Sequence, residues 1–153
     1  MNPPQIYYDW AVLVEELSKC ENDAEILDAM QAGTIAWQEG VSTRFVNMLM
    51  DVVDDRLNRA VDKFQSMLEK GDSNSMMGGI AALRRELIFL RNVVSINAIP
   101  SPHKDNLIAH VVNFSAQIQS SLEDSAQNDS TGKLLSSLQN NPVTITSYDQ
   151  EAM

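Results

Sequence analysis

The chain has 153 residues, of which 44% are hydrophobic and 21% are charged, with a formal net charge of −10 and one cysteine. This length suits a single domain that buries one core without metals or disulfides, and the composition excludes a disordered or fibrous chain. The acidic charge disfavours nucleic acid as a partner, and a lone cysteine excludes an intramolecular disulfide, which fits the reducing cytoplasm.

The sequence lacks the features of membrane proteins and of exported proteins. It has no apolar run of about 18 residues, the length at which a hydrophobic segment becomes a candidate to span a bilayer. The first residues, MNPPQIYYDWAVLVEELSK, lack the basic start, apolar middle and small-residue cleavage site of a signal peptide. We therefore predict a cytoplasmic protein that has no membrane partner.

Hydrophobic residues recur at intervals of three and four along most of the chain, which places their side chains on one side of an α-helix. The first predicted helix lies within residues 6–20 and the second within residues 22–40. In the second, Asn22 and Glu25 match a capping box at the start, and Gly40 suits a left-handed helix end. The predicted buried positions are Ile6, Trp10, Leu13, Leu17, Cys20, Ile26, Met30, Gly33 and Trp37.

The next two predicted helices are long. The third begins near residue 42 and is broken by KGDSNS, residues 70–75. The fourth carries residues 80–94 and ends before Pro100, because a proline disfavours helical backbone in the residue ahead of it. The glycines of MMGGI, residues 76–80, indicate a helix start or a flexible joint. The predicted buried positions are Val46, Leu49, Val53, Leu57, Ala60, Phe64, Met67, Ile80, Leu83, Leu87, Leu90 and Val94.

The fifth predicted helix begins at Ser101 and Pro102, which form a suitable cap and first-turn pair. A short helix is predicted around residues 134–138. The segment NNPVTITSYDQEAM, residues 140–153, is read as extended or mobile. The predicted buried positions of the fifth helix are Leu107, Val111, Phe114, Ile118 and Leu122.

These elements predict an all-α fold, an antiparallel bundle of about five helices with a mobile C-terminal tail, because short connections make neighbouring helices run in opposite directions. Residues 1–127 form the predicted bundle domain, and residues 128–153 form a short helix and a flexible tail. The coiled-coil-like spacing of the long helices also predicts self-association, with a dimer as the simplest homo-oligomer.

A row of aspartates in the third helix resembles a set of metal ligands. Asp51, Asp55 and Asp62 are separated by four and seven residues, so they share one side of a helix. Arg59 follows Asp55 by four positions and precedes Asp62 by three, which suits ordinary surface pairing. Because the opposite side already carries the apolar stripe, we predict that the row is a solvent-exposed face.

The sequence provides no motif for catalysis or for cofactor binding. It contains no glycine-rich phosphate loop, no Cys-x-x-Cys pair and no His-Glu-x-x-His sequence. Neither His103 nor His110 has a glutamate three positions earlier, the spacing that carboxylate di-metal bundles use. We therefore predict no catalytic residue, no metal and no cofactor, and we keep a carboxylate and histidine metal-binding bundle enzyme as an alternative.

Residues 79–110 form the basic part of the chain, with four basic and two acidic residues. The fourth helix carries three arginines there, and two apolar residues lie outside its buried stripe. Arginine is favoured at protein interfaces, and methionine adapts to irregular binding surfaces. The predicted partner-binding residues are Arg84, Arg85, Ile88, Phe89, Arg91, Met76 and Met77.

The leading functional hypothesis is a non-enzymatic protein–protein interaction module, an adaptor, chaperone or regulator that holds or sequesters a protein partner of unknown identity. Besides the metal-binding enzyme, weak nucleic-acid binding through the strip from Arg84 to Arg91 is a further alternative. Such binding would weaken steeply as the salt concentration rises.

Overall fold

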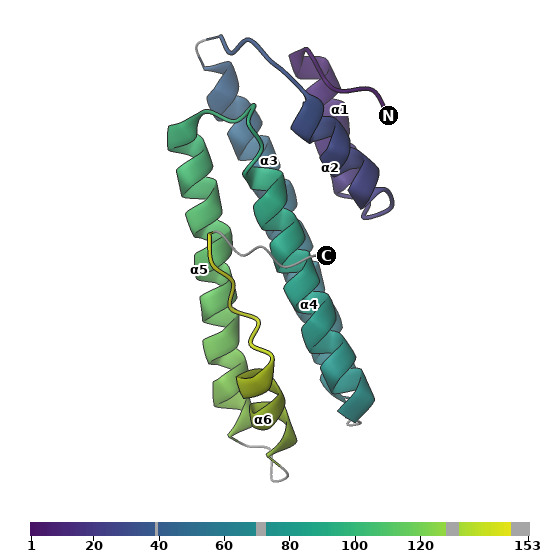
Figure 1. Ribbon diagram of the computed structural model, residues 1–153, viewed down its shortest axis with the longest axis vertical. Coiled ribbons are helices and arrows are strands. Elements are labelled where there is room, and N and C mark those ends of the chain that lie inside the picture. The colour runs from purple at the N-terminus through teal and green to yellow at the C-terminus, as the bar shows by residue number, and fades with distance from the viewer. Residues whose placement is uncertain (39, 70–72, 128–131, 148–153) are drawn as a thin grey trace. The chain divides into compact units, whose positions relative to one another are not determined.

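The computed structural model describes residues 1–38, 40–69, 73–127 and 132–147. Within these ranges the chain has no strand, and 76% of it is helical, so the predicted all-α helical bundle is confirmed. The predicted break at residues 70–75 falls partly on residues 70–72, and these lie outside the described ranges, as do residues 148–153 of the predicted tail. The helices (Figure 1) are α1 (Tyr7–Leu17), α2 (Asp23–Ala32), α3 (Val41–Glu69), α4 (Ser73–Val94), α5 (Ser101–Ala126) and α6 (Lys133–Asn140).

The chain forms two compact units. Unit 1 consists of Met1–Arg56 and Asn92–Ile108, and unit 2 consists of Leu57–Arg91 and Ala109–Met153. Each of the long helices α3, α4 and α5 therefore contributes residues to both units. The division of the chain into a domain of residues 1–127 and a tail of residues 128–153 stays a prediction.

The core of unit 1 is built around Trp10, which lies in α1 and is fully buried. Its ring meets the ring of Phe45 edge to face at a centroid distance of 5.6 Å, and its indole N–H donates to the carbonyl of Thr34 at 3.1 Å. Helices α1 and α2 lie side by side in this unit (Figure 1). Other fully buried side chains of the same unit are Leu17, Ile26, Met30, Leu49 and Ile99.

Helix α2 is shorter than the sequence predicts, because it ends at Ala32 and does not reach Gly40. The next residue, Gly33, is extended, and a Cβ atom there would lie 2.7 Å from side-chain atoms of both Pro4 and Trp10. Close packing at that position thus redirects the chain. The predicted capping box is also wrong, since the side chain of Asn22 makes no capping hydrogen bond.

Two glycines that the sequence analysis placed at a helix start or a joint lie inside α4, so that interpretation is wrong. Residues 73–79 are helical, and Gly79 faces α3 at a point where a Cβ atom would come within 2.7 Å of the Phe64 ring. Glycine therefore lets α4 approach α3 closely in unit 2. The predicted stripe of α4 is confirmed, because each of its five positions is at most 2% exposed.

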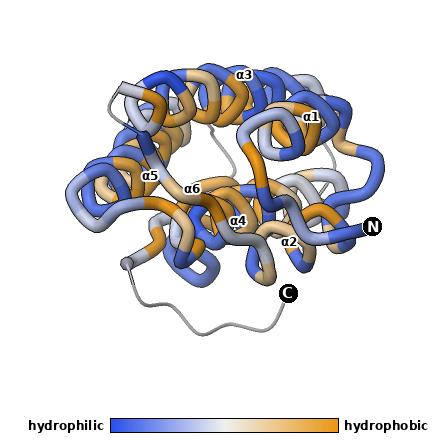
Figure 2. Tube along the Cα trace, turned by 90° about the horizontal axis from the view of Figure 1, so that it is seen from above, coloured by the Kyte–Doolittle hydropathy of each residue, from blue (hydrophilic) through white to orange (hydrophobic). Residues whose placement is uncertain are grey.

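Along α3, α4 and α5, hydrophobic residues gather on one side of each helix and hydrophilic residues on the other (Figure 2). The stripe of α5 differs from the prediction. Phe114 and Ile118 are only partly buried, whereas Ser115 and Gln119, one position further along, are buried. This rotation of the buried side follows from an additional element that packs against α5, the extended segment of residues 142–146.

Candidate functional site

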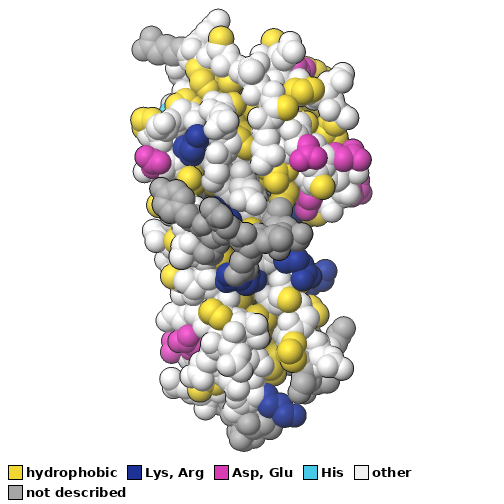
Figure 3. All heavy atoms as spheres, in the orientation of Figure 1, with side chains coloured by type: hydrophobic (Ala, Val, Ile, Leu, Met, Phe, Trp, Pro, Cys, Tyr) yellow, Lys and Arg dark blue, Asp and Glu magenta, His cyan; other side chains and the backbone are white. Residues whose placement is uncertain are grey.

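A pocket of about 680 Å³ lies between α4 and α6 in unit 2. Four of the predicted partner-binding residues, Met77, Arg84, Arg85 and Ile88, line it. The face drawn in Figure 3 shows Lys and Arg side chains next to hydrophobic ones over α4 and α6. The remaining lining residues are Ile80, Ala81, Ser137, Asn140, Asn141 and Pro142.

The predicted partner-binding residues separate into an accessible group and a buried group. Met77 is 55% exposed, Arg85 is exposed, and Met76 and Arg84 are half-buried. Ile88, Phe89 and Arg91, in contrast, are 3%, 6% and 4% exposed. Of these three residues only Ile88 lines the pocket. All three are nearly covered, because the residues packed against α4 in unit 2 cover more of its circumference than a single stripe requires.

Two of the arginines hold the extended segment of residues 142–146, which we call the strap. Nη1 of Arg84 donates to the carbonyl of Pro142 at 2.9 Å and to the carbonyl of Thr144 at 2.8 Å. One heptad further along α4, Nη1 of Arg91 donates to the carbonyl of Thr146 at 3.0 Å. The arginines that the sequence analysis assigned to a partner therefore bind the backbone of their own chain.

Helix α5 holds the strap from its other side (Figure 1). Oε1 of Gln119 accepts a hydrogen bond from the N–H of Val143 at 2.8 Å, and Oγ of Ser115 accepts one from the N–H of Ile145 at 3.1 Å. The two peptide groups that link residues 142–143 and 144–145 thus each connect α4 to α5. Between these bonds the side chains of Val143 and Ile145 are 0% and 1% exposed.

The strap accounts for most of the buried polar side chains in the described structure. Those side chains are Arg56, Arg91, Ser115 and Gln119, and the last three all bind strap backbone. A buried polar group costs free energy unless it is hydrogen-bonded, and in the described residues no buried side-chain nitrogen or oxygen lacks a partner. Four side chains, Arg84, Arg91, Ser115 and Gln119, therefore form a site for an extended backbone, which we call the strap site.

The helix pattern in the sequence gives no indication of a role for Ser115, Gln119 or the buried residues of the strap. The available signal was the alternation in PVTIT, residues 142–146, where Val143 and Ile145 stand between polar neighbours. The structure agrees with the extended alternative for this segment. It also shows that Val143 and Ile145 are buried, although the sequence predicted no buried residue in this segment.

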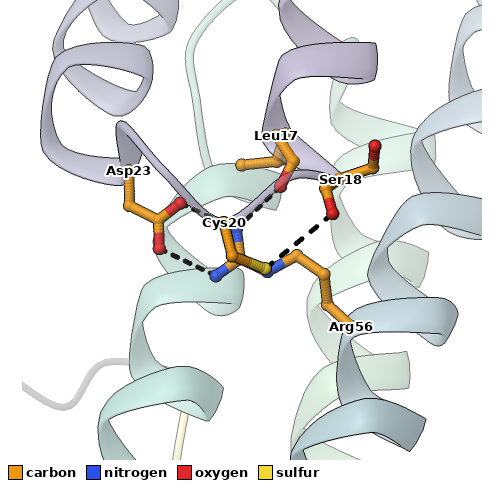
Figure 4. Close-up of polar contacts among 5 residues, drawn as sticks. All are labelled: Leu17, Ser18, Cys20, Asp23 and Arg56. Atoms are coloured by element: carbon orange, nitrogen blue, oxygen red, sulfur yellow. Dashed lines mark hydrogen bonds and ion pairs between the residues drawn. The ribbon is translucent and has the colours of Figure 1, made fainter.

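A second polar cluster lies in unit 1 and is centred on Arg56 (Figure 4). Its guanidinium donates to both carboxylate oxygens of Asp23, at 2.9 and 2.8 Å, and to the carbonyl of Leu17 at 3.0 Å. The carbonyl belongs to the last residue of α1 and the carboxylate to the first residue of α2. Arg56 therefore fastens the turn between α1 and α2 to α3, with the bidentate geometry that favours arginine over lysine.

The same turn holds an exposed ion pair. Nζ of Lys19 donates to Oε1 of Glu16 at 2.8 Å, and this hydrogen bond, together with the negative charge of Glu16, raises the pKa of Lys19 above its ordinary value of 10.5. Cys20 follows in the left-handed conformation, with φ of 58°, and it is exposed. These features describe how α1 ends.

The aspartate row of α3 is exposed at all three of its positions, Asp51, Asp55 and Asp62, as the sequence analysis predicted. Among the described residues, no group of three or more His, Cys, Asp or Glu side chains is arranged to hold a metal ion. His103 and His110, the two histidines of α5, are both half-buried.

No protein-family model, no curated protein and no solved structure matches this chain. A search of the described helices found none with the length and apolar character needed to cross a bilayer.

Proposed function

We propose that this chain is a non-enzymatic protein–protein interaction module, an adaptor, chaperone or regulator, and that it holds a protein partner at the pocket between α4 and α6. The observation that carries the proposal is the composition of this pocket. It combines the exposed side chain of Met77 with the guanidinium groups of Arg84 and Arg85.

The chemistry of the lining defines the kind of partner segment that fits. Met77, Ile80 and Ala81 offer an apolar surface, and a flexible thioether adapts to partner side chains of different shape. Arg85 is exposed beside them, where a guanidinium forms paired hydrogen bonds with a carboxylate. We infer a partner segment that presents an apolar side chain close to an acidic one.

Self-association and location belong to the same proposal. A second copy of this acidic chain is a source of such segments, so a homo-oligomer, with a dimer as its simplest form, is one version of the proposed complex. The acidic composition and the exposed Cys20 suit a cytoplasmic protein.

Affinity purification with a matched pair of charge reversals tests the proposal. Arg85→Glu changes the pocket, whereas Arg44→Glu makes the same charge change at an exposed position of α3 in unit 1. A tagged chain is expressed in its native cells, and the retained proteins are quantified. We expect a protein that wild type and Arg44→Glu retain and Arg85→Glu loses. Identical retention by all three chains would contradict the proposal.

A further inference from the structure

The strap site recognises backbone atoms and makes few demands on the sequence that it binds. The hydrogen bonds described between the strap and Arg84, Arg91, Ser115 and Gln119 go to carbonyl or N–H groups of the strap. The bonded carbonyls are those of residues 142, 144 and 146, and the bonded N–H groups are those of residues 143 and 145. Such alternation is the pattern of an extended strand, and it is how proteins that bind extended peptides obtain affinity from the main chain.

Sequence preference at this site comes from two side chains. Val143 and Ile145 are buried, whereas Pro142, Thr144 and Thr146 are exposed. A second segment therefore fits the same site if it is extended and carries branched aliphatic residues at two alternate positions. In such a complex, main-chain bonds supply affinity and the two apolar positions supply selectivity.

The strap and the pocket share structural parts. Arg84 lines the pocket and binds the strap through the same guanidinium, and Pro142 lines the pocket and supplies one of the bonded carbonyls. A carboxylate that takes Nη1 of Arg84 from the pocket side competes with the carbonyls of Pro142 and Thr144, to which Nη1 donates. The first residues of the strap are consequently the ones that a ligand in the pocket loosens.

We propose that the strap site is a binding site for an extended segment of a partner protein with two branched aliphatic residues at alternate positions, and that residues 142–146 occupy it as an internal competitor. The proposal deepens the proposed function, because it names the form of peptide that an interaction module of this kind takes. It differs from the pocket proposal in depending on Arg91, Ser115 and Gln119 and not on Arg85.

A labelled peptide of residues 140–147, NNPVTITS, is the probe. It is titrated with the full wild-type chain and with the full chain carrying Val143→Asp and Ile145→Asp, and binding is followed by fluorescence anisotropy. Because an occupied site lowers the apparent affinity for a competitor, we expect the double variant to bind at least about tenfold more tightly than wild type. A control peptide with aspartate at the same two positions is expected not to bind.

Two further substitutions in the double-variant chain identify the site. Gln119→Ala removes the acceptor of one strap N–H and should weaken peptide binding by about tenfold, the usual consequence of an unmade buried hydrogen bond. Arg44→Glu, at an exposed position of α3 in unit 1, should leave the peptide affinity unchanged, whereas retention of a cellular partner at the pocket depends on Arg85 and not on Gln119. Failure of this proposal and failure of the pocket proposal are therefore distinguishable.

Hydrogen exchange of the wild-type chain tests the proposal without any substitution. A displaceable strap opens without the helices, so the amides of Val143 and Ile145 should exchange at least about a hundredfold faster than those of Leu87 and Val111. Three results would overturn the proposal. The first is equal exchange at these four amides, and the second is a folded double variant that does not bind the peptide. The third is a wild-type dimer that becomes a monomer in the double variant, because such a dimer would be formed by exchange of straps between two copies.

Discussion

Removal of the Arg56 guanidinium is the substitution whose effect follows most directly from the structure. Arg56→Ala leaves the carbonyl of Leu17 and the carboxylate of Asp23 without the donor that now joins them. The side chain of Arg56 is 1% exposed and that of Asp23 is 34% exposed, so water compensates the carboxylate in part. The carbonyl of Leu17 keeps a longer hydrogen bond, 3.4 Å, from the N–H of Cys20.

The expected cost is worked from these contacts. Breaking a fully buried ion pair by removing one partner costs about 3–5 kcal/mol, and a hydrogen bond to a charged group is worth about 1.5–3 kcal/mol. The carboxylate of Asp23 is about one-third exposed, so its loss of the arginine costs less than the full value for a buried ion pair. We therefore expect Arg56→Ala to lower the free energy of unfolding by about 2–3 kcal/mol. For a chain of this size that corresponds to a fall in Tm of about 5–10 °C.

Urea unfolding followed by circular dichroism measures the effect. Arg59→Ala is the control, since Arg59 is exposed on the same helix and its removal should change the free energy of unfolding by less than about 0.5 kcal/mol. A double-mutant cycle with Asp23→Ala should give a coupling energy of at least about 1 kcal/mol between the two side chains. If Arg56→Ala lowers the free energy of unfolding no more than Arg59→Ala does, the bonds from Arg56 to Leu17 and Asp23 do not stabilise the protein.

Three further substitutions test packing, two of them in unit 2 and one in unit 1. Gly79→Ala should destabilise the protein by about 1–2 kcal/mol, since the added methyl group forces the Phe64 ring to move. Gly78→Ala should stabilise it by about 0.5 kcal/mol, because alanine favours a helix more than glycine does and the position has room for a methyl group. Thermal unfolding measures both changes, and equal shifts in Tm would contradict the close contact at Gly79. Trp37→Phe removes the bond from Trp37 to the carbonyl of Ala98, which is 2.7 Å long, and should cost about 1 kcal/mol in urea unfolding. An unchanged midpoint would mean that this bond contributes nothing.

The helical fold was predictable because its signal is local and long. In α4, apolar residues at three- and four-residue intervals continue over four turns, so the stripe from Ile80 to Val94 identifies the buried side without any knowledge of its neighbours. Chain termini and turns carry weaker signals. Asn22 and Gly40 matched helix-end patterns, but packing of Gly33 against Pro4 ended α2 earlier.

The polar parts of the structure were not predictable from local pattern. Arg56 stands in an acidic stretch that resembles a solvent-exposed face, and its burial depends on partners 39 and 33 positions earlier in the chain. The strap is five residues long, and its bonds connect residues 24 to 60 positions apart. Contacts of this kind become visible only when the helices are in place, so Arg84 and Arg91 appeared in the sequence as partner-binding residues.

Site-specific photo-crosslinking tests most directly whether the pocket between α4 and α6 holds a protein. A benzophenone amino acid is placed at Ala81, which is exposed and lines the pocket, or at Ala116, an exposed position of α5. After irradiation of the native cells, we predict a discrete product of higher mass from position 81 and none from position 116. The mass then distinguishes a second copy from a different protein. No product from position 81, or equal products from both positions, would contradict the account.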